Sequence, residues 1–213
     1  MALLQKGFMG LFSGRIGNLV GYNINGVQYV RSLPRKRKKP PTSAQKVQRK
    51  KFSLMIKFLS PLVPFIRELQ SVQKFGKPGY GRIISRNHKQ VIGGTYPNFV
   101  IDFRQLQISA GSLGIPTSIK VSCDGKGVLN FRWRNDYSYL DHSNPSDRLW
   151  LACYDEDEKS WEIMKEAGFR RDENIKINFK RHRTNRLQVY AGFISFDCKR
   201  VSNSRYLGMI NVL

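Results

Sequence analysis

The chain has 213 residues and a formal net charge of +22. Hydrophobic residues make up 40% of it and aromatic residues 12%, which is enough for a packed core and excludes a disordered basic tail. No stretch reaches the roughly 18 consecutive apolar residues that a membrane-spanning helix needs, so we expect no membrane span.

The positive charge is concentrated in the first half of the chain. Residues 1–99 contain 19 Lys or Arg and a single acid, Glu68, which gives a net charge of +18. Residues 100–213 contain 18 basic and 14 acidic residues, which gives +4. This imbalance predicts a polyanionic partner for the first half. Nucleic acid, anionic lipid headgroups and an acidic protein surface would all satisfy it.

The first predicted element is a β-hairpin. Strand-like runs at Leu19–Ile24 and Val27–Ser32 flank Asn25-Gly26. This dipeptide is the strongest short hairpin signal, because a type I′ turn needs a positive φ at both central positions. A basic run at residues 35–39 follows the hairpin and leads into Pro40-Pro41, which indicates a stiff, extended segment.

An amphipathic helix is predicted next, with Thr42 or Ser43 as its cap. Its apolar residues recur at spacings of three and four and form one stripe: Val47, Leu54, Met55, Phe58, Leu59, Leu62, Val63 and Ile66. Basic residues lie largely off this stripe: Lys46, Arg49, Lys50 and Lys57. Pro61 and Pro64 predict a break in the helix or the start of a second one.

The pattern weakens between Gly76 and Gly94, where we expect a loop with one short helix at residues 83–91. This region adds four residues to the basic set: Lys77, Arg82, Arg86 and Lys89.

From about residue 99 the sequence changes to short alternating strands. They are predicted at residues 105–109, 118–123, 128–134, 148–154, 161–165, 174–180, 187–195 and 205–212. Strands of this number and spacing, separated by turn signals, predict a β-sandwich. The expected fold class is therefore α+β. An N-terminal β-hairpin and basic helical region at residues 1–97 precedes a C-terminal immunoglobulin/fibronectin-like β-sandwich at residues 98–213.

Catalytic and metal-binding motifs are not apparent. The histidines fall in separate predicted loops or loop edges: His88, His142 and His182. No nucleophile elbow, phosphate-binding loop or HExxH motif accompanies them. The acidic turn at residues 155–158 fits a solvated hairpin tip better than a calcium loop. We expect a protein without enzymatic activity, cofactor or metal.

The cysteines are odd in number and far apart: Cys123, Cys153 and Cys198. Without a CxxC pair or a Cys/His ladder, a zinc site is disfavoured. Buried thiols in a reducing compartment are the simplest interpretation. One disulfide with one free thiol remains the alternative.

Five motifs resemble those of one protein family. They are FSGRIGNLVGY, VQYVRSLP, PPTSAQ with the following QR.KF, GTYPNFVIDF and VSNSRYLG. Over nearly its whole length the chain is similar to an uncharacterised domain-of-unknown-function family common in Bacteroidota. The resemblance implies an N-terminal helical region, a C-terminal β-sandwich and no assigned activity. The run RKRKK departs from the mixed or neutral segment expected there, so a binding role for it would be peculiar to this protein.

Nonspecific binding to the phosphate backbone of DNA or RNA is the function we favour, because each contact between a phosphate and Lys or Arg releases a condensed counterion whatever the base sequence. The candidate contacts are Arg31, Arg35, Lys36, Arg37, Lys38, Lys39, Lys46, Arg49, Lys50 and Lys57. Base reading by Gln45, Gln48 and Arg49 is suggested by their place at the helix start, but no helix-turn-helix partner precedes them. Three aromatic residues could stack on bases, although we expect core packing for at least two of them: Tyr22, Tyr29 and Phe52.

The alternative function is a structural subunit of a larger assembly, such as a phage or virion-like particle or a ribonucleoprotein. The basic arm and the sandwich would then make contacts with protein partners or with further copies of the chain. A surface adhesion module would demand export, and residues 1–22 lack the order of a signal peptide. We expect a cytoplasmic bacterial protein or a component of a virion-like assembly.

Overall fold

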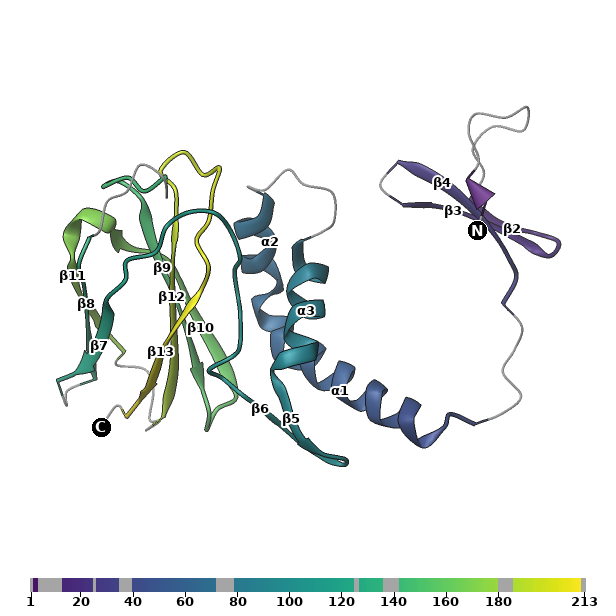
Figure 1. Ribbon diagram of the computed structural model, residues 1–213, viewed down its shortest axis with the longest axis horizontal. Helices are drawn as coiled ribbons and strands as arrows, with labels where there is room; N and C mark the ends of the chain where they lie inside the picture. Colours follow the sequence, from purple (N-terminus) through teal and green to yellow (C-terminus); the bar gives the residue numbers. More distant parts are fainter. Residues whose placement is uncertain are drawn as a thin grey trace. The chain divides into compact units, whose positions relative to one another are not determined.

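The computed structural model describes residues 2–3, 13–24, 26–34, 40–71, 79–124, 127–135, 142–179 and 186–211. The chain divides into two compact units, Met1–Thr42 and Ser43–Leu213. The first unit is a small sheet, and the second combines helices with several sheets (Figure 1). The protein is therefore of mixed α+β class and mostly β-strand.

The first unit is an antiparallel sheet with the strand order β1-β4-β3-β2. Its strands are β1 (Ala2–Leu3), β2 (Gly14–Ile16), β3 (Leu19–Ile24) and β4 (Val27–Ser32). The predicted hairpin is confirmed, since β3 and β4 have the predicted bounds. Gly26 has a φ of 83°, a left-handed value that glycine adopts without strain, whereas Asn25 lies outside the described residues. β1 and β2 were not predicted, because such short strands show no alternation.

The second unit begins with helices. They are α1 (Ser43–Leu59), a single 3₁₀ turn η1 (Ser60–Leu62), α2 (Val63–Ser71) and α3 (Gly79–Gln90). The predicted break occurs at Pro61, which lies in the first turn of η1, where a missing N–H removes no helical hydrogen bond. The apolar stripe is the buried face, and Met55, Leu59, Leu62 and Ile66 are fully buried in it. The helix expected at residues 83–91 begins four residues earlier than predicted.

Two antiparallel sheets follow and pack face to face. One has the order β11-β8-β7 and the other β10-β9-β12-β13. Their strands are β7 (Ile119–Cys123), β8 (Val128–Trp133), β9 (Arg148–Asp155), β10 (Ser160–Phe169), β11 (Asn174–Asn178), β12 (Leu187–Ile194) and β13 (Arg205–Ile210). Leu129 and Phe131 of one sheet share a core with Leu151 and Val189 of the other. Seven of the eight strands predicted in this region are confirmed.

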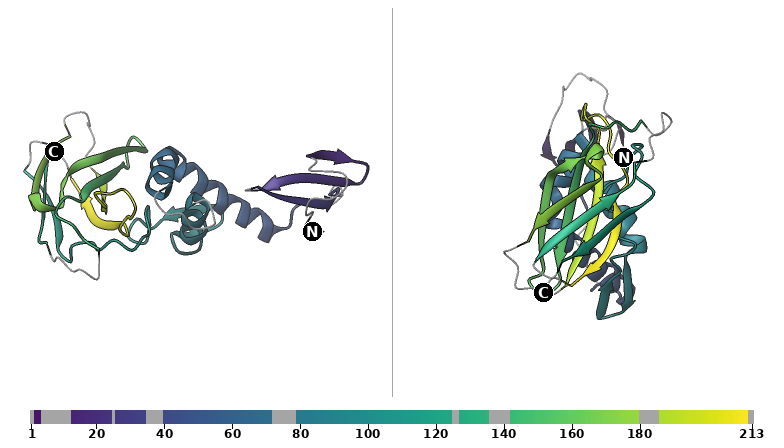
Figure 2. Two further views of the ribbon diagram at one scale, coloured as in Figure 1. Left: turned by 90° about the horizontal axis from the view of Figure 1, so that it is seen from above. Right: turned by 90° about the vertical axis from the view of Figure 1, so that its left-hand side faces the viewer.

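The central strands β9 and β12 are buried on both faces. Alternate residues point to opposite sides of a strand, so one set faces the three-stranded sheet, while Trp150, Ala152 and Tyr190 face the helices. Figure 2 shows the resulting three layers, with the helices on one side of the four-stranded sheet and the three-stranded sheet on the other. Near α1, Trp161 Nε1 donates a hydrogen bond to the Phe58 carbonyl at 3.1 Å.

The helices therefore belong to the same compact unit as the sheets. The expected division after residue 97 grouped them with the hairpin, whereas the compact units divide after Thr42. The physical reason is the apolar stripe of α1 and α2, which packs against the outer face of the four-stranded sheet.

Two local features differ from the expectation. Residues 105–109 do not form a strand, because their backbone groups bond to side chains: Gln107 N–H donates to Asn87 Oδ1 at 2.9 Å, and Ile108 N–H to Ser204 Oγ at 2.8 Å. A hairpin replaces the end of the predicted loop, with strands β5 (Ile92–Thr95) and β6 (Asn98–Ile101). Its glycine-rich first strand carries no alternating pattern.

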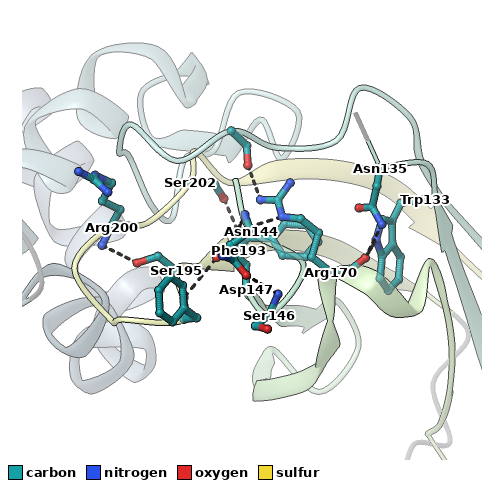
Figure 3. Close-up of polar contacts among 12 residues, drawn as sticks. Trp133, Asn135, Asn144, Ser146, Asp147, Arg170, Phe193, Ser195, Arg200 and Ser202 are labelled. Carbon is teal, nitrogen blue, oxygen red and sulfur yellow. Dashed lines mark hydrogen bonds and ion pairs between the residues drawn. The ribbon is translucent and has the colours of Figure 1, made fainter. Parts of the chain in front are cut away.

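A buried ion pair joins the two sheets at one end (Figure 3). Arg170 Nε donates to Asp147 Oδ2 at 3.0 Å, and these side chains are 1% and 0% exposed. The guanidinium also donates to the Gly114 carbonyl at 2.6 Å and lies 4.3 Å from the centroid of the Phe193 ring. Burial raises the pKa of the Asp147 carboxyl, and the hydrogen bonds it accepts and the charge of Arg170 oppose that shift. The cluster is structural, since its polar groups are directed at one another.

Candidate functional site

Helix α1 presents a basic stripe to solvent. Lys46, Arg49, Lys50 and Lys57 are exposed, and their spacings of three, four and seven place them on one face of the helix. That face differs from the one that buries Met55 and the rest of the apolar stripe. The four predicted contacts on this helix therefore lie together. Their alignment follows from the 3.6-residue period that also forms the apolar stripe.

Helix α3 carries a second basic stripe. Arg82, Arg86 and Lys89 are exposed and recur at i, i+4 and i+7, which again places them on one helix face. The two helices are neighbours, because the Phe52 ring of α1 meets the His88 ring of α3 edge-on with centroids 6.0 Å apart. We call the two stripes together the basic helical surface; it consists of Lys46, Arg49, Lys50, Lys57, Arg82, Arg86 and Lys89. The three α3 residues belonged to the basic set but were not among the predicted contacts. The helix predicted at residues 83–91 contained Arg86 and Lys89 and left out only Arg82.

Some cations of the sheets and their connections are neutralised by nearby acids. Ion pairs there include Arg170–Asp147 at 3.0 Å, Arg186–Asp157 at 3.2 Å and Lys199–Asp197 at 3.7 Å, as well as Arg148–Glu166. In the helical layer the single acid, Glu68, is ion-paired with Lys165 of β10. Within the described part of the chain, Lys46, Arg49, Lys50 and Lys57 take part in no ion pair. Their positive fields therefore add rather than cancel.

The remaining predicted contacts belong to the first unit. Arg31 is exposed on β4, and its guanidinium carbon lies 5.5 Å from the centroid of the Tyr22 ring. The basic run at residues 35–39 lies outside the described residues: Arg35, Lys36, Arg37, Lys38 and Lys39. Arg15 of β2 is a further exposed cation that the sequence did not single out.

The expectation of core packing for the candidate stacking residues is wrong. Phe52 is 52% exposed, and Tyr22 and Tyr29 are half-buried rather than enclosed in a core. The two tyrosines are opposite each other on β3 and β4 and stack with ring centroids 5.7 Å apart. Aromatic rings therefore remain accessible beside basic residues in both units. Gln45 and Gln48 are exposed near the start of α1.

The acidic turn at residues 155–158 is held by hydrogen bonds to its first carboxylate. Asp155 is 2% exposed, and its Oδ1 accepts hydrogen bonds from the backbone N–H groups of Asp157 and Glu158, both at 2.9 Å. The acidic turn is thus the tip of the β9–β10 hairpin, as predicted, although its first carboxylate is buried. Among the described residues, no cluster of three or more His, Cys, Asp or Glu side chains could hold a metal ion.

The interpretation of the cysteines as buried thiols applies to one of them. All three are free thiols, with Cys153 buried, Cys123 half-buried and Cys198 exposed. Burial raises the pKa of the Cys153 thiol, which leaves it unreactive.

A hollow of about 660 Å³ lies beside β13 and is lined in part by Arg104, Ile115, Arg205 and Tyr206. Arg205 is already engaged there, since its guanidinium donates to the carbonyls of Pro116 at 2.6 Å and Thr117 at 2.7 Å. The hollow therefore offers less free positive charge than the helices do.

Among the described residues, no helix has both the length and the apolar character to cross a membrane.

Three comparisons with known proteins bear on the identity of the chain. No curated protein matches the chain, and no solved structure matches it. A family model described as a family of unknown function, DUF6266, matches residues 11–208. The chain therefore belongs to the DUF6266 family, whose function is unknown.

Proposed function

We propose that this protein is a non-catalytic polyanion-binding protein that contacts the phosphate backbone of DNA or RNA without sequence preference. The basic helical surface and the basic residues of the first unit would make the contacts. One observation carries the proposal: four cations of α1 are exposed and take part in no ion pair within the described chain, and their helix contains no acid. Solubility alone does not require surface charges of one sign. Charges of one sign repel one another and destabilise the fold.

The dimensions of the α1 stripe suit a nucleic acid backbone. From Lys46 to Lys57 the helix rises by about 16 Å, at 1.5 Å per residue. Duplex DNA carries about one charge per 1.7 Å of its axis, so a stretch of this length presents enough phosphates for all four cations. Each contact releases counterions, which is favourable and independent of base sequence. Binding of this kind would be steeply salt-dependent.

The first prediction concerns that salt dependence. Replacing Lys46, Arg49, Lys50 and Lys57 with glutamine should weaken binding to a 20-base-pair duplex, measured by fluorescence anisotropy between 50 and 200 mM salt. The slope of log K against log salt should decrease in magnitude by about 0.9 for each phosphate that is no longer neutralised, or about 3.6 in all. Neutralising residues 35–39 in the same way tests the basic run.

A matched control removes the same charge from the three-stranded sheet. Lys120, Arg132, Arg134 and Lys176 are also exposed, and their replacement by glutamine should leave the slope unchanged. An equal loss in both variants would show that net charge alone drives binding and would overturn the assignment to α1. If the unaltered chain binds no duplex at 50 mM salt, the proposed function is wrong.

The sheets support an immunoglobulin/fibronectin-type sandwich as the scaffold. Counted from β7 to β13, the first, second and fifth strands form one sheet, and the fourth, third, sixth and seventh form the other. Constant-type immunoglobulin domains divide six of these seven strands between their sheets in the same way. The difference is the fourth strand, β10, which here pairs with β9 in the second sheet.

A subunit of a larger assembly, such as a virion-like particle or a ribonucleoprotein, is a second candidate function. It is favoured by the β5–β6 hairpin, which forms a two-stranded sheet of its own and exposes 52% of Tyr96 and 66% of Val100. Exposed apolar side chains on strand edges are a common basis for pairing with another chain.

Sedimentation velocity tests the assembly. The chain should sediment faster than a monomer as its concentration rises, and Val100→Lys should return it to the monomer. Ser122→Lys, at an exposed position of β7, supplies the same charge elsewhere and should not. A monomer at every concentration would contradict this second function.

A further inference from the structure

The sheet of the first unit has an aromatic and basic face. In the antiparallel register Tyr22 is opposite Tyr29, Val20 is opposite Arg31 and Ile24 is opposite Val27, and opposed residues share a face. Arg15 of β2 is opposite Val20 and joins them. We call this set the tyrosine face; it consists of Arg15, Val20, Tyr22, Ile24, Val27, Tyr29 and Arg31.

The tyrosine face exposes apolar side chains where β3 ends and β4 begins. Ile24 is 51% exposed and Val27 38%, whereas Gln28 and Val30, which point to the other side of β4, are 4% and 8% exposed. The burial on that opposite side is local to β4, since Ile16 and Leu19 on the same side are 57% and 50% exposed. On the tyrosine face, Ile24 and Val27 leave an exposed apolar surface beside the tyrosines. An exposed apolar surface bordered by cations is typical of a binding site.

The two tyrosine rings stack on each other and form the aromatic platform of this face. Their ring planes differ by 19° and their centroids are 5.7 Å apart. The Arg31 guanidinium carbon lies over the Tyr22 ring, 5.5 Å from its centroid, which places a donor for phosphate on the aromatic pair. Tyrosine has only two side-chain torsions, so such a platform loses little conformational entropy when a ligand binds.

Charge and shape together define the ligand. Residues 1–42 contain eight Lys or Arg and no acid, which selects an anion. The paired rings select a partner with flat, accessible π faces. Bases in a duplex are stacked on one another, whereas unpaired bases expose faces that can stack on tyrosine. A nucleic acid single strand combines both properties in every nucleotide.

We infer that the tyrosine face binds single-stranded nucleic acid, with bases stacked on Tyr22 and Tyr29 and phosphates contacted by Arg15 and Arg31. This rests on the proposed polyanion binding and adds a preference for unpaired strands to it. The stacking contribution is apolar and does not release counterions, whereas the arginine contribution does. The two contributions can therefore be separated by measuring how the binding affinity depends on salt concentration.

The test uses the full chain with a 20-nucleotide single strand of thymidine and with a 20-base-pair duplex. Tyr22→Ala and Tyr29→Ala should each weaken single-strand binding about tenfold, with the slope of log K against log salt unchanged and duplex binding unaffected. Arg31→Gln should instead reduce the slope by about 0.7, the value for one contact on a single strand. Phe196→Ala removes an exposed aromatic ring of the second unit and should leave binding to both nucleic acids unchanged.

Two further variants separate stacking from folding. Tyr22→Phe with Tyr29→Phe keeps the rings and should bind like the unaltered chain. Tyr22→Leu with Tyr29→Leu keeps apolar side chains on the sheet and should bind as weakly as the alanine variants. A leucine variant that retains full single-strand affinity would overturn the stacking.

The outcomes also distinguish this inference from the proposed function. If the tyrosine variants bind the single strand normally while the α1 variant loses duplex binding, stacking is wrong and polyanion binding stands. If neither nucleic acid binds at 50 mM salt, both fail. If the tyrosine variants lose affinity only for vesicles of anionic lipid, the face is a membrane-binding surface and the inference is overturned.

Discussion

Replacing Asp147 with alanine should lower the free energy of unfolding of the second unit by about 3–5 kcal/mol, the usual effect of removing one member of a buried ion pair. The change would leave the Arg170 guanidinium, 1% exposed, as an uncompensated charge between the sheets. It would also remove the acceptor of the Asn144 N–H, at 2.8 Å, and of the Phe196 N–H, at 3.2 Å. Three interactions at one end of the two sheets would disappear together (Figure 3).

Urea unfolding followed by tryptophan fluorescence measures this loss. The three tryptophans, Trp133, Trp150 and Trp161, all lie in the second unit, so the signal reports on that unit alone. Glu166→Ala is the control. The Glu166 side chain is 65% exposed and forms a surface ion pair with Arg148, so its removal should lower the free energy of unfolding by less than about 1 kcal/mol.

A double variant tests whether the unpaired charge of Arg170 causes this loss of stability. Asp147→Leu combined with Arg170→Met replaces the whole pair by apolar side chains and should be more stable than Asp147→Ala, since no buried charge is left unpaired. Equal losses in Asp147→Ala and in Glu166→Ala would mean that the buried pair has no special role.

Replacing Gly192 with alanine should destabilise the same unit by about 3 kcal/mol, at the upper end of the usual range for overpacking. Gly192 of β12 is directly opposite Trp150 of β9. An added Cβ would come within 2.6 Å of Trp150 Cε2, and the indole cannot move aside, because it is fully buried and packs edge-on against Phe65 with centroids 5.3 Å apart. For a unit of this size we expect a melting temperature lower by about 6–12 °C.

Differential scanning calorimetry with two companion variants checks this expectation. Gly81→Ala in α3 has no atom within 4 Å of the new Cβ and should stabilise the unit by up to about 1 kcal/mol through helix propensity. In a Trp150→Leu background, Gly192→Ala should cost much less, since the ring that it meets is gone. If Gly192→Ala lowers the stability by the same amount in both backgrounds, the steric explanation is wrong.

The sequence patterns predicted those elements that depend on residues close to one another in the chain. The β3–β4 hairpin has its predicted bounds because the turn signal in the sequence and the two strand patterns beside it lie within fourteen residues. The α1 cations could be placed for the same reason, since one period positions both the apolar and the basic stripe. On α3 only Arg82 depended on where the helix begins, whereas the contact between α1 and α3, which brings their basic stripes together, is a tertiary one.

Long-range partners explain the remaining differences. Residues 105–109 have an alternating pattern, but their backbone bonds to Asn87 and Ser204, which are distant in sequence. The same limit applies to Tyr22 and Tyr29, because alternation shows that they share a face without showing which face of the sheet is buried. The position of the helices on the outer face of β9 and β12 was likewise set by packing between remote segments.

The burial of β9 and β12 on both faces has a consequence for synthesis on the ribosome. Helices α1 and α2 emerge early, but the strands that cover their apolar stripe come much later. Trp161, which bonds to the Phe58 carbonyl, follows it by 103 residues. At a translation rate of roughly 5–20 residues per second, that stripe has α3 but none of its sheet partners for about 5–20 s. Nascent chains should therefore engage chaperones during this interval, and a chain truncated before β12 should aggregate because its exposed helices and strands have lost their shared core.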